Sequence, residues 1–203
     1  MSWRGVPAHP GKGFDKVVSA AQSSEATVWQ IDPNSTQVEF AVGHLGISTI
    51  KGRFNGVRGQ ISDVPEDRSL ASVEIEIDAA SLDTGQDERD GHLRSAMFLD
   101  AEVHPTIVFR SAQIEVQNEN QLRVAGQLSC HGMMAEVVLD ATVNGHAINP
   151  ITQDRVLGFS ATGKLSRSAF GIELPAPFAG TNFVGDDIEI WINVEAVRTA
   201  ESM

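Results

Sequence analysis

The chain has 203 residues, and its 27 Asp and Glu outnumber its 15 Lys and Arg, so the formal net charge at pH 7 is −12. A surface this acidic repels nucleic acid and anionic membranes and favours solubility. The single cysteine excludes an intramolecular disulfide, and the apolar stretches are too short for a membrane-spanning helix.

Residues 1–26 are rich in Gly, Pro, Ser and Ala and are predicted to form a flexible N-terminal extension. Phe14, Val17, Val18 and Ala21 follow helical spacing, so a short helix that docks on the barrel, its mouth or a second subunit is the alternative. The first residues lack the charged region and following apolar region of a secretion signal, which predicts a cytoplasmic protein, or a periplasmic one if Met1 is not the native start. Residues 27–203 are predicted to form one domain.

From Trp29 to Val194 the chain repeatedly alternates apolar and polar residues, the pattern of half-buried β-strands. Val38, Phe40 and Val42 open the series, and glycines in the next segment mark bulges, bends or close backbone approach. We count about eight or nine strands joined by short polar turns such as Asn118–Asn120 and Asn144-Gly145. This spacing predicts an all-β fold, either an antiparallel sandwich or a single antiparallel β-barrel of about eight strands.

One segment, Thr84 to Phe98, follows a helical pattern instead. Thr84 and Asp87 have the spacing of a capping pair, and Arg89, Leu93 and Met97 share a face at four-residue spacing. We expect one short helix between strands that covers an open end of the barrel.

Catalytic motifs are scarce. Cys130 and His131 are strand neighbours that point to opposite faces, which disfavours a catalytic pair. No two histidines have a metal-ligand spacing, although His44, His92 and His131 could converge at one barrel end. An enzyme that acts on a hydrophobic substrate with histidine-based or metal-assisted chemistry therefore stays the alternative to a binding protein, and a module with a filled core is a third reading.

The inner phase of the strands is almost entirely aliphatic, and the chain has no Tyr. Because a barrel of eight strands is just wide enough for one small ligand, a slender apolar lumen is predicted. The candidate lumen residues are Phe40, Val42, Phe54, Ile75, Ile77, Leu93, Phe109, Leu128, Leu139, Phe159 and Phe170.

A dozen motifs in order resemble the YceI-like family of polyisoprenoid-binding proteins. They cover about Thr27 to Val197 and include Trp29–Pro33, His44-Leu45-Gly46, Arg89–Leu93, His104–Phe109, His131-Gly132, Arg167–Gly171 and Val184-Gly185-Asp186. The resemblance implies a lipocalin-like barrel whose lumen holds a polyisoprenoid, an isoprenoid quinone or a fatty amide or acid, for storage or transport, without catalysis and without a cofactor or metal. It also implies a bacterial protein, with a homodimer as an expected assembly.

A polar lipid head would need donors at the mouth of the lumen. Arg89, His92 and Arg167 are the candidates, with His44 at a strand end beside them, because guanidinium groups bind phosphate in a bidentate way. The alternative is structural: Arg89 would pair with Asp87 or Asp90, and Arg167 with Asp186 or Asp187.

Overall fold

The computed structural model describes residues 26–64 and 67–199, so the predicted extension and its docking helix lie outside the described residues. The strands are β1 (Thr27–Ile31), β2 (Gln37–His44), β3 (Ser48–Phe54), β4 (Val57–Asp63), β5 (Ser72–Asp78), β6 (Leu82–Asp83), β7 (Thr106–Val116), β8 (Gln121–Cys130), β9 (Met133–Ile148), β10 (Arg155–Ser166) and β11 (Val184–Arg198). The helices are the 3-10 turns η1 (Arg68–Leu70), η2 (Ala79–Ser81) and η3 (Arg167–Phe170) and the α-helix α1 (Asp87–Arg94).

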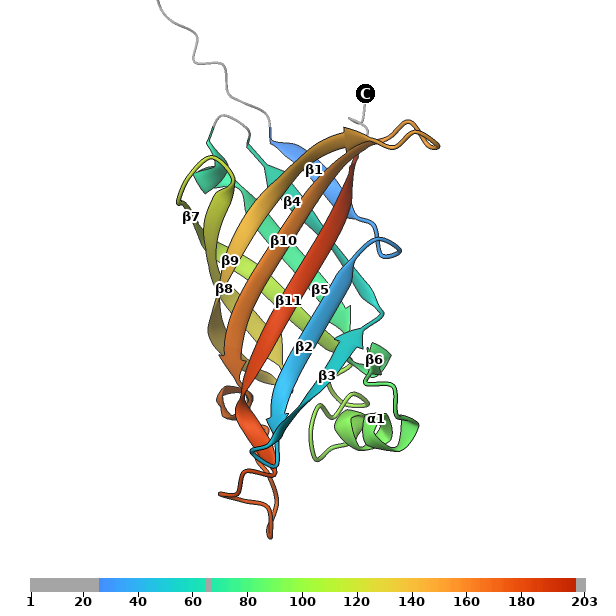
Figure 1. The fold of residues 1–203 in the computed structure, drawn as a ribbon. Coiled ribbons are helices and arrows are strands. Elements are labelled where there is room, and N and C mark those ends of the chain that lie inside the picture. The colour runs from blue at the N-terminus through green and yellow to red at the C-terminus, as the bar shows by residue number, and fades with distance from the viewer. Residues whose placement is uncertain (1–25, 65–66, 200–203) are drawn as a thin grey trace, which may run out of the picture.

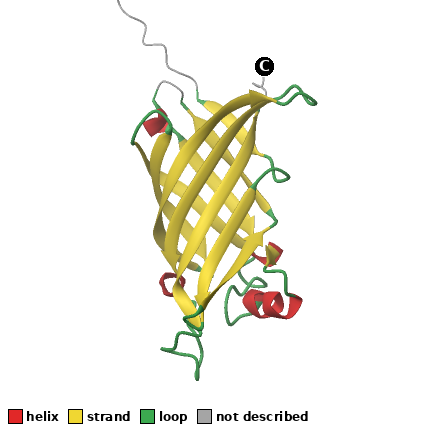
Figure 2. Ribbon diagram, viewed as in Figure 1, coloured by secondary structure: helices red, strands yellow, loops and turns green. Residues whose placement is uncertain are grey.

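Eight strands close an antiparallel barrel in the order β1-β4-β5-β7-β8-β9-β10-β11, with β11 returning to β1 (Figure 1). This confirms the predicted all-β barrel. Figure 2 shows how little of the molecule is helical. One edge of β11 pairs with two different strands: Ala196–Arg198 pair with β1, and residues 184–193 pair with β2.

The divided edge makes the two ends of the barrel different. Strand β2 continues into β3 and then β6, and β3 reaches β6 only through Arg53 and Phe54. Strands β3 and β4 do not pair, and β6 and α1 lie beyond β3 at one end of the barrel (Figure 1). We call it the helix end; it also carries the β2–β3 and β8–β9 turns and the segment 171–183. The turn between β9 and β10 and the helix η1 lie at the opposite end.

Two local predictions were wrong. Asn144-Gly145 is not a turn but part of the long strand β9, where the register against β10 shifts by one residue at Gly158 and Phe159. The segments on both sides of a β-bulge stay hydrogen-bonded to the neighbouring strand, so the Asn-Gly pair here forms a bulge and not a turn. The helix is also shorter than predicted, and its N-cap is the side chain of Gln86, which accepts a hydrogen bond from the Arg89 backbone.

Candidate functional site: an apolar cavity inside the barrel

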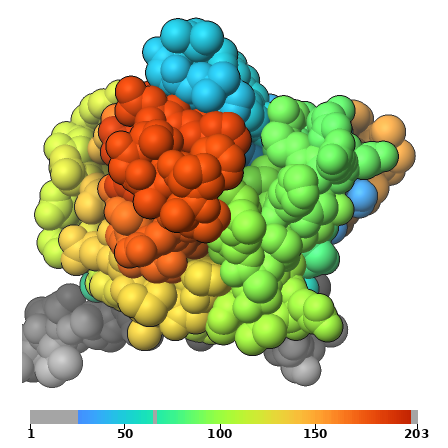
Figure 3. Space-filling view, turned by 90° about the horizontal axis from the view of Figure 1, so that it is seen from below, coloured from blue at the N-terminus to red at the C-terminus, as the bar shows by residue number. Residues whose placement is uncertain are grey.

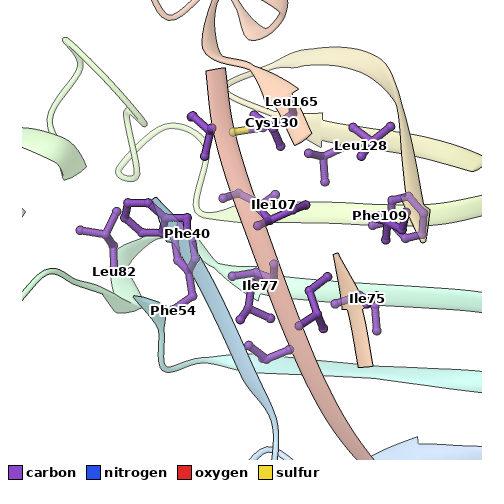
Figure 4. A pocket seen from close by; sticks show the side chains of 18 of the residues that line it. Phe40, Phe54, Ile75, Ile77, Leu82, Ile107, Phe109, Leu128, Cys130 and Leu165 are labelled. Carbon is purple, nitrogen blue, oxygen red and sulfur yellow. The ribbon is translucent and has the colours of Figure 1, made fainter. Parts of the chain in front are cut away.

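The barrel encloses a cavity of about 790 Å³, within the range of ~300–1,000 Å³ typical of small-molecule sites. Strands β2 to β11 all contribute side chains to its wall, nearly all aliphatic or aromatic (Figure 4). Every predicted lumen residue lies on this wall: Phe40, Val42, Phe54, Ile75, Ile77, Leu93, Phe109, Leu128, Leu139, Phe159 and Phe170. Contact of these side chains with a ligand stays a prediction.

Two glycines explain how phenylalanines line the barrel without filling it. A Cβ atom on Gly52 would lie 2.4 Å from Cζ of Phe40, and one on Gly126 would lie 2.6 Å from Cζ of Phe109. Each ring therefore lies against the backbone of the neighbouring strand. Glycine at these positions is required by close approach, one of the roles predicted from the sequence.

The segment 171–183 crosses the helix end and contributes Ile172, Leu174, Pro175, Phe178 and Phe183 to the cavity wall. The rings of Phe178 and Phe183 stack with centroids 4.3 Å apart, and the Phe183 ring lies 5.5 Å from that of His44. Sequence reasoning missed this segment because it has no strand or helix periodicity. The available signal was the presence of two phenylalanines, Phe178 directly after Pro177 and Phe183 five residues later, in an otherwise irregular segment.

Polar residues of the cavity wall gather on α1, where Gln86, Glu88, Arg89 and His92 join Leu93. The guanidinium of Arg89 donates from Nε to Thr84 Oγ1 (2.7 Å) and from Nη2 to the Thr84 carbonyl (2.9 Å).

Thr84 is itself anchored to the helix. The buried carboxylate of Asp90 accepts hydrogen bonds from the Thr84 amide (3.0 Å) and from its hydroxyl. Arg89 is thus positioned by Thr84 rather than by the predicted pairing with Asp87 or Asp90, and Thr84 is not the helix cap. Arg89 and Leu93 share one face of α1, whereas Met97 lies beyond the end of the helix; all three line the cavity.

Arg167 also reaches the cavity wall, but its donors are engaged by the protein. It donates to the carbonyls of Ile172 and Gly185 and lies 3.6 Å from Asp186, with only 12% of its side chain exposed. The carboxylate of Asp186 accepts from the Ser168 amide (3.0 Å) and hydroxyl (2.9 Å). The structure therefore contains the predicted Arg167–Asp186 ion pair, which ties η3 to the start of β11.

Burial alone would raise the pKa of Asp186. The hydrogen bonds from Ser168 and the positive charge of Arg167 outweigh that effect and hold the pKa below its usual range. At neutral pH the carboxylate is charged and the η3 contact is fully formed.

The geometry gives little support to histidine or cysteine chemistry. His44 and His92 lie on the cavity wall, but His131 does not, and its Nδ1 contacts the Phe170 carbonyl at 3.0 Å. Within residues 26–64 and 67–199, no group of three or more His, Cys, Asp or Glu could hold a metal. Cys130 lies on the wall, and burial raises the pKa of its thiol to about 11, which keeps it protonated and weakly nucleophilic.

Four further polar residues, Thr36, Asp63, Arg68 and Ser160, line the cavity away from α1. Asp63 is buried, and Arg68 donates from Nη1 to the Glu119 carbonyl at 2.5 Å. The apolar alternation did not mark these positions: Thr36 directly precedes β2, Asp63 is the last residue of β4, Arg68 lies in η1 and Ser160 is a polar residue within β10. In the described part of the chain, no helix is long and apolar enough to cross a membrane.

Comparison with known proteins agrees with this architecture. The model of the YceI-like domain matches residues 29–196. A UPF0312 protein of Vibrio cholerae is 36% identical over 164 residues, which are 80% of this chain and 86% of the relative.

Solved structures share the fold. Burkholderia cenocepacia BcnA superposes with a TM-score of 0.72 at 22% identity, covering 81% of this chain and 98% of BcnA. A polyisoprenoid-binding domain from Saccharophagus degradans superposes with a TM-score of 0.63 at 13% identity, covering 84% of this chain and 98% of that domain. Together with the matched domain, the sequence relatives assign this chain to the YceI-like family.

Proposed function

We propose that this barrel binds one long apolar lipid chain in its cavity, as a carrier or store and not as an enzyme. The observation that carries the proposal is the cavity of about 790 Å³, walled by apolar side chains from ten strands. Burial of apolar surface stabilises such a complex by roughly 25 cal/mol per Å² and needs few directional contacts. The name of the Saccharophagus degradans domain, polyisoprenoid-binding, supports a polyisoprenoid as the ligand. An isoprenoid quinone or a fatty amide or acid has the same long apolar chain and belongs to the same proposal.

The polar residues at the helix end suit a ligand with a small polar head. Arg89 keeps its Nη1 donors beyond the two hydrogen bonds to Thr84, and His92, three residues further along α1, lies on the same cavity-lining face as Arg89 and Leu93. We infer that a hydroxyl, amide, quinone or phosphate head would contact Arg89 and His92. Arg167, whose donors are engaged, would instead hold η3 in place.

The test is a titration of delipidated protein with linear isoprenoid alcohols of two, three, four and more units. Affinity is expected to rise with each unit, by at most ~4 kcal/mol at ~0.8 kcal/mol per buried carbon group, until the cavity is full. The variant with His44, His92 and His131 all replaced by Gln is expected to keep most of this affinity, because the wall supplies it. An affinity that does not change with the length of the isoprenoid chain would contradict the proposal. So would an enzymatic turnover that the wild type shows and the triple-histidine variant loses.

We also propose that the protein assembles as a homodimer, a prediction that is tested independently of lipid binding. Sedimentation of the full chain and of a shortened chain that begins at Thr27 tests it. A monomer in both would refute it, and a dimer that survives the truncation would exclude only the extension as its cause.

A further inference from the structure

The helix end exposes a group of large apolar side chains. Its members come from separate turns around the barrel end, and we call them the apolar rim: Ile47, Met97, Val103, Met133, Met134 and Phe178. Figure 3 views this end, with the β2–β3 turn, the segment 171–183, the β8–β9 turn and α1 meeting around it. Isolated exposed apolar residues are ordinary, but a group at one end of a molecule marks an interaction site.

Contacts between neighbouring segments show that the turns and loops that carry the rim adjoin one another. The Leu45 amide donates to the Phe183 carbonyl (3.2 Å), which joins the β2–β3 turn to the segment 171–183. A Cβ atom on Gly171 would lie 3.6 Å from Met133, so this segment also adjoins the β8–β9 turn. The rings of His104 and His131, 5.6 Å apart, connect that turn to the loop that holds Val103.

The rim is also continuous with the cavity. Met97 and Phe178 are 54% and 39% exposed, yet both line the cavity wall. The opposite end has exposed apolar residues too, Leu70, Val116, Ile148 and Ile151, but none of these four lines the cavity. In the described part of the chain, exposed apolar side chains that also line the lumen therefore lie at the helix end.

The charges around the rim determine which surface it fits. The helix and loops of this end carry Asp87, Glu88, Asp100, Glu102 and Glu173 as well as the buried Asp90. The helices and loops of this end hold three half-buried arginines whose guanidinium groups bond to backbone carbonyls, Arg89 to Thr84, Arg94 to Leu82 and Arg167 to Ile172.

An acidic setting of this kind repels an anionic surface. It also repels a second copy of the same rim, which would bring two sets of carboxylates together. An uncharged lipid surface meets neither penalty, and its hydrocarbon accommodates side chains that protrude from separate turns without a matching shape.

We propose that the apolar rim docks the barrel on uncharged lipid bilayers, so that an apolar chain passes between bilayer and cavity without crossing water. This inference rests on the proposed function, since a protein without a lipid ligand would have no need of such a path. It adds the place of exchange, the helix end, and the class of membrane surface, one without net charge.

The experiment is flotation of the full chain with phosphatidylcholine vesicles, and with vesicles in which about a third of the lipid is phosphatidylglycerol. Ile47→Asp is the test variant and Ile151→Asp its matched control, because the two residues are 87% and 89% exposed, lie in turns at opposite ends, and gain the same charge. Met134→Asp is a second test variant from another turn. Binding of a dansyl-labelled geranylgeranyl probe in solution is measured for all four proteins.

The wild type and Ile151→Asp are expected to float with phosphatidylcholine vesicles, and Ile47→Asp and Met134→Asp to bind them at least tenfold more weakly. All four should bind the probe equally, and anionic lipid should weaken flotation. Probe binding without flotation of the wild type would refute the rim and leave the proposed function intact, whereas loss of both would refute both. Equal effects of Ile47→Asp and Ile151→Asp, or a dimer that Ile47→Asp dissociates, would also overturn the inference.

Discussion

Filling the lumen from within should abolish ligand binding without unfolding the barrel. Ala161 on β10 faces the cavity, opposite Ala141 of β9 and Ile192 of β11, so Ala161→Trp projects a large ring into the hollow. An indole buries roughly 150–250 Å². If it removes ~100 Å² of ligand contact, the loss is ~2.5 kcal/mol at ~25 cal/mol per Å², or about 70-fold in Kd.

The control is Thr162→Trp, which adds the same ring one residue along on the exposed outer face of the same strand. Both variants are compared with the wild type in thermal unfolding and in binding of the dansyl-labelled geranylgeranyl probe. We expect Thr162→Trp to bind as the wild type does and Ala161→Trp to bind about 70-fold more weakly while still folded. A folded Ala161→Trp that binds with unchanged affinity would show that the ligand lies elsewhere.

Three further predictions concern single side chains. Phe109→Glu places a carboxylate on the apolar wall at a cost of several kcal/mol, so it should unfold the barrel or leave it without lipid. The control Glu115→Gln, on the outer face of β7, should change neither folding nor lipid binding. A folded Phe109→Glu that retains lipid would contradict this prediction. Cys130, with its pKa raised to about 11, should react with iodoacetamide at pH 8 far more slowly in the folded than in the unfolded protein, and bound lipid should slow it further; equal rates would refute its burial. Folding lowers the pKa of Asp186, so its stabilising contact with Ser168 is present above about pH 4 and is lost as the pH falls through the folded-state pKa. The difference in unfolding free energy between the wild type and Asp186→Asn should therefore disappear in acid. A difference that does not depend on pH would refute this role of Asp186.

The barrel could be predicted because alternation specifies the face of each strand residue by residue. Ile75 and Ile77 point inward and Glu74 and Glu76 outward on β5, as the period of two requires, and each pairs on both sides within an antiparallel ladder. A shift of the strand register by one residue would have turned all the inward-facing apolar side chains of β5 toward the solvent. The lumen positions follow from the same rule.

Features that depend on contacts between distant segments could not be predicted. Strands β1 and β2 share one edge of β11 and are joined by the turn at residues 32–36. The sequence of this turn does not distinguish a connection along one shared edge from an ordinary hairpin turn. The capping of α1 by Gln86 and the positioning of Arg89 by Thr84 arise because Asp90 is buried against the barrel end. The segment 171–183 has no periodicity, and only tertiary packing places Phe178 at the cavity.

The most direct test of the central claim is organic extraction and mass spectrometry of the full-length protein as purified from cells, with native mass spectrometry of the intact complex. The account predicts one class of long-chain lipid at close to one molecule per barrel, lost in Ala161→Trp and kept in Thr162→Trp. A protein that carries no lipid and takes up none from added isoprenoid alcohols, or one that carries stoichiometric zinc, iron or copper in its place, would contradict the account.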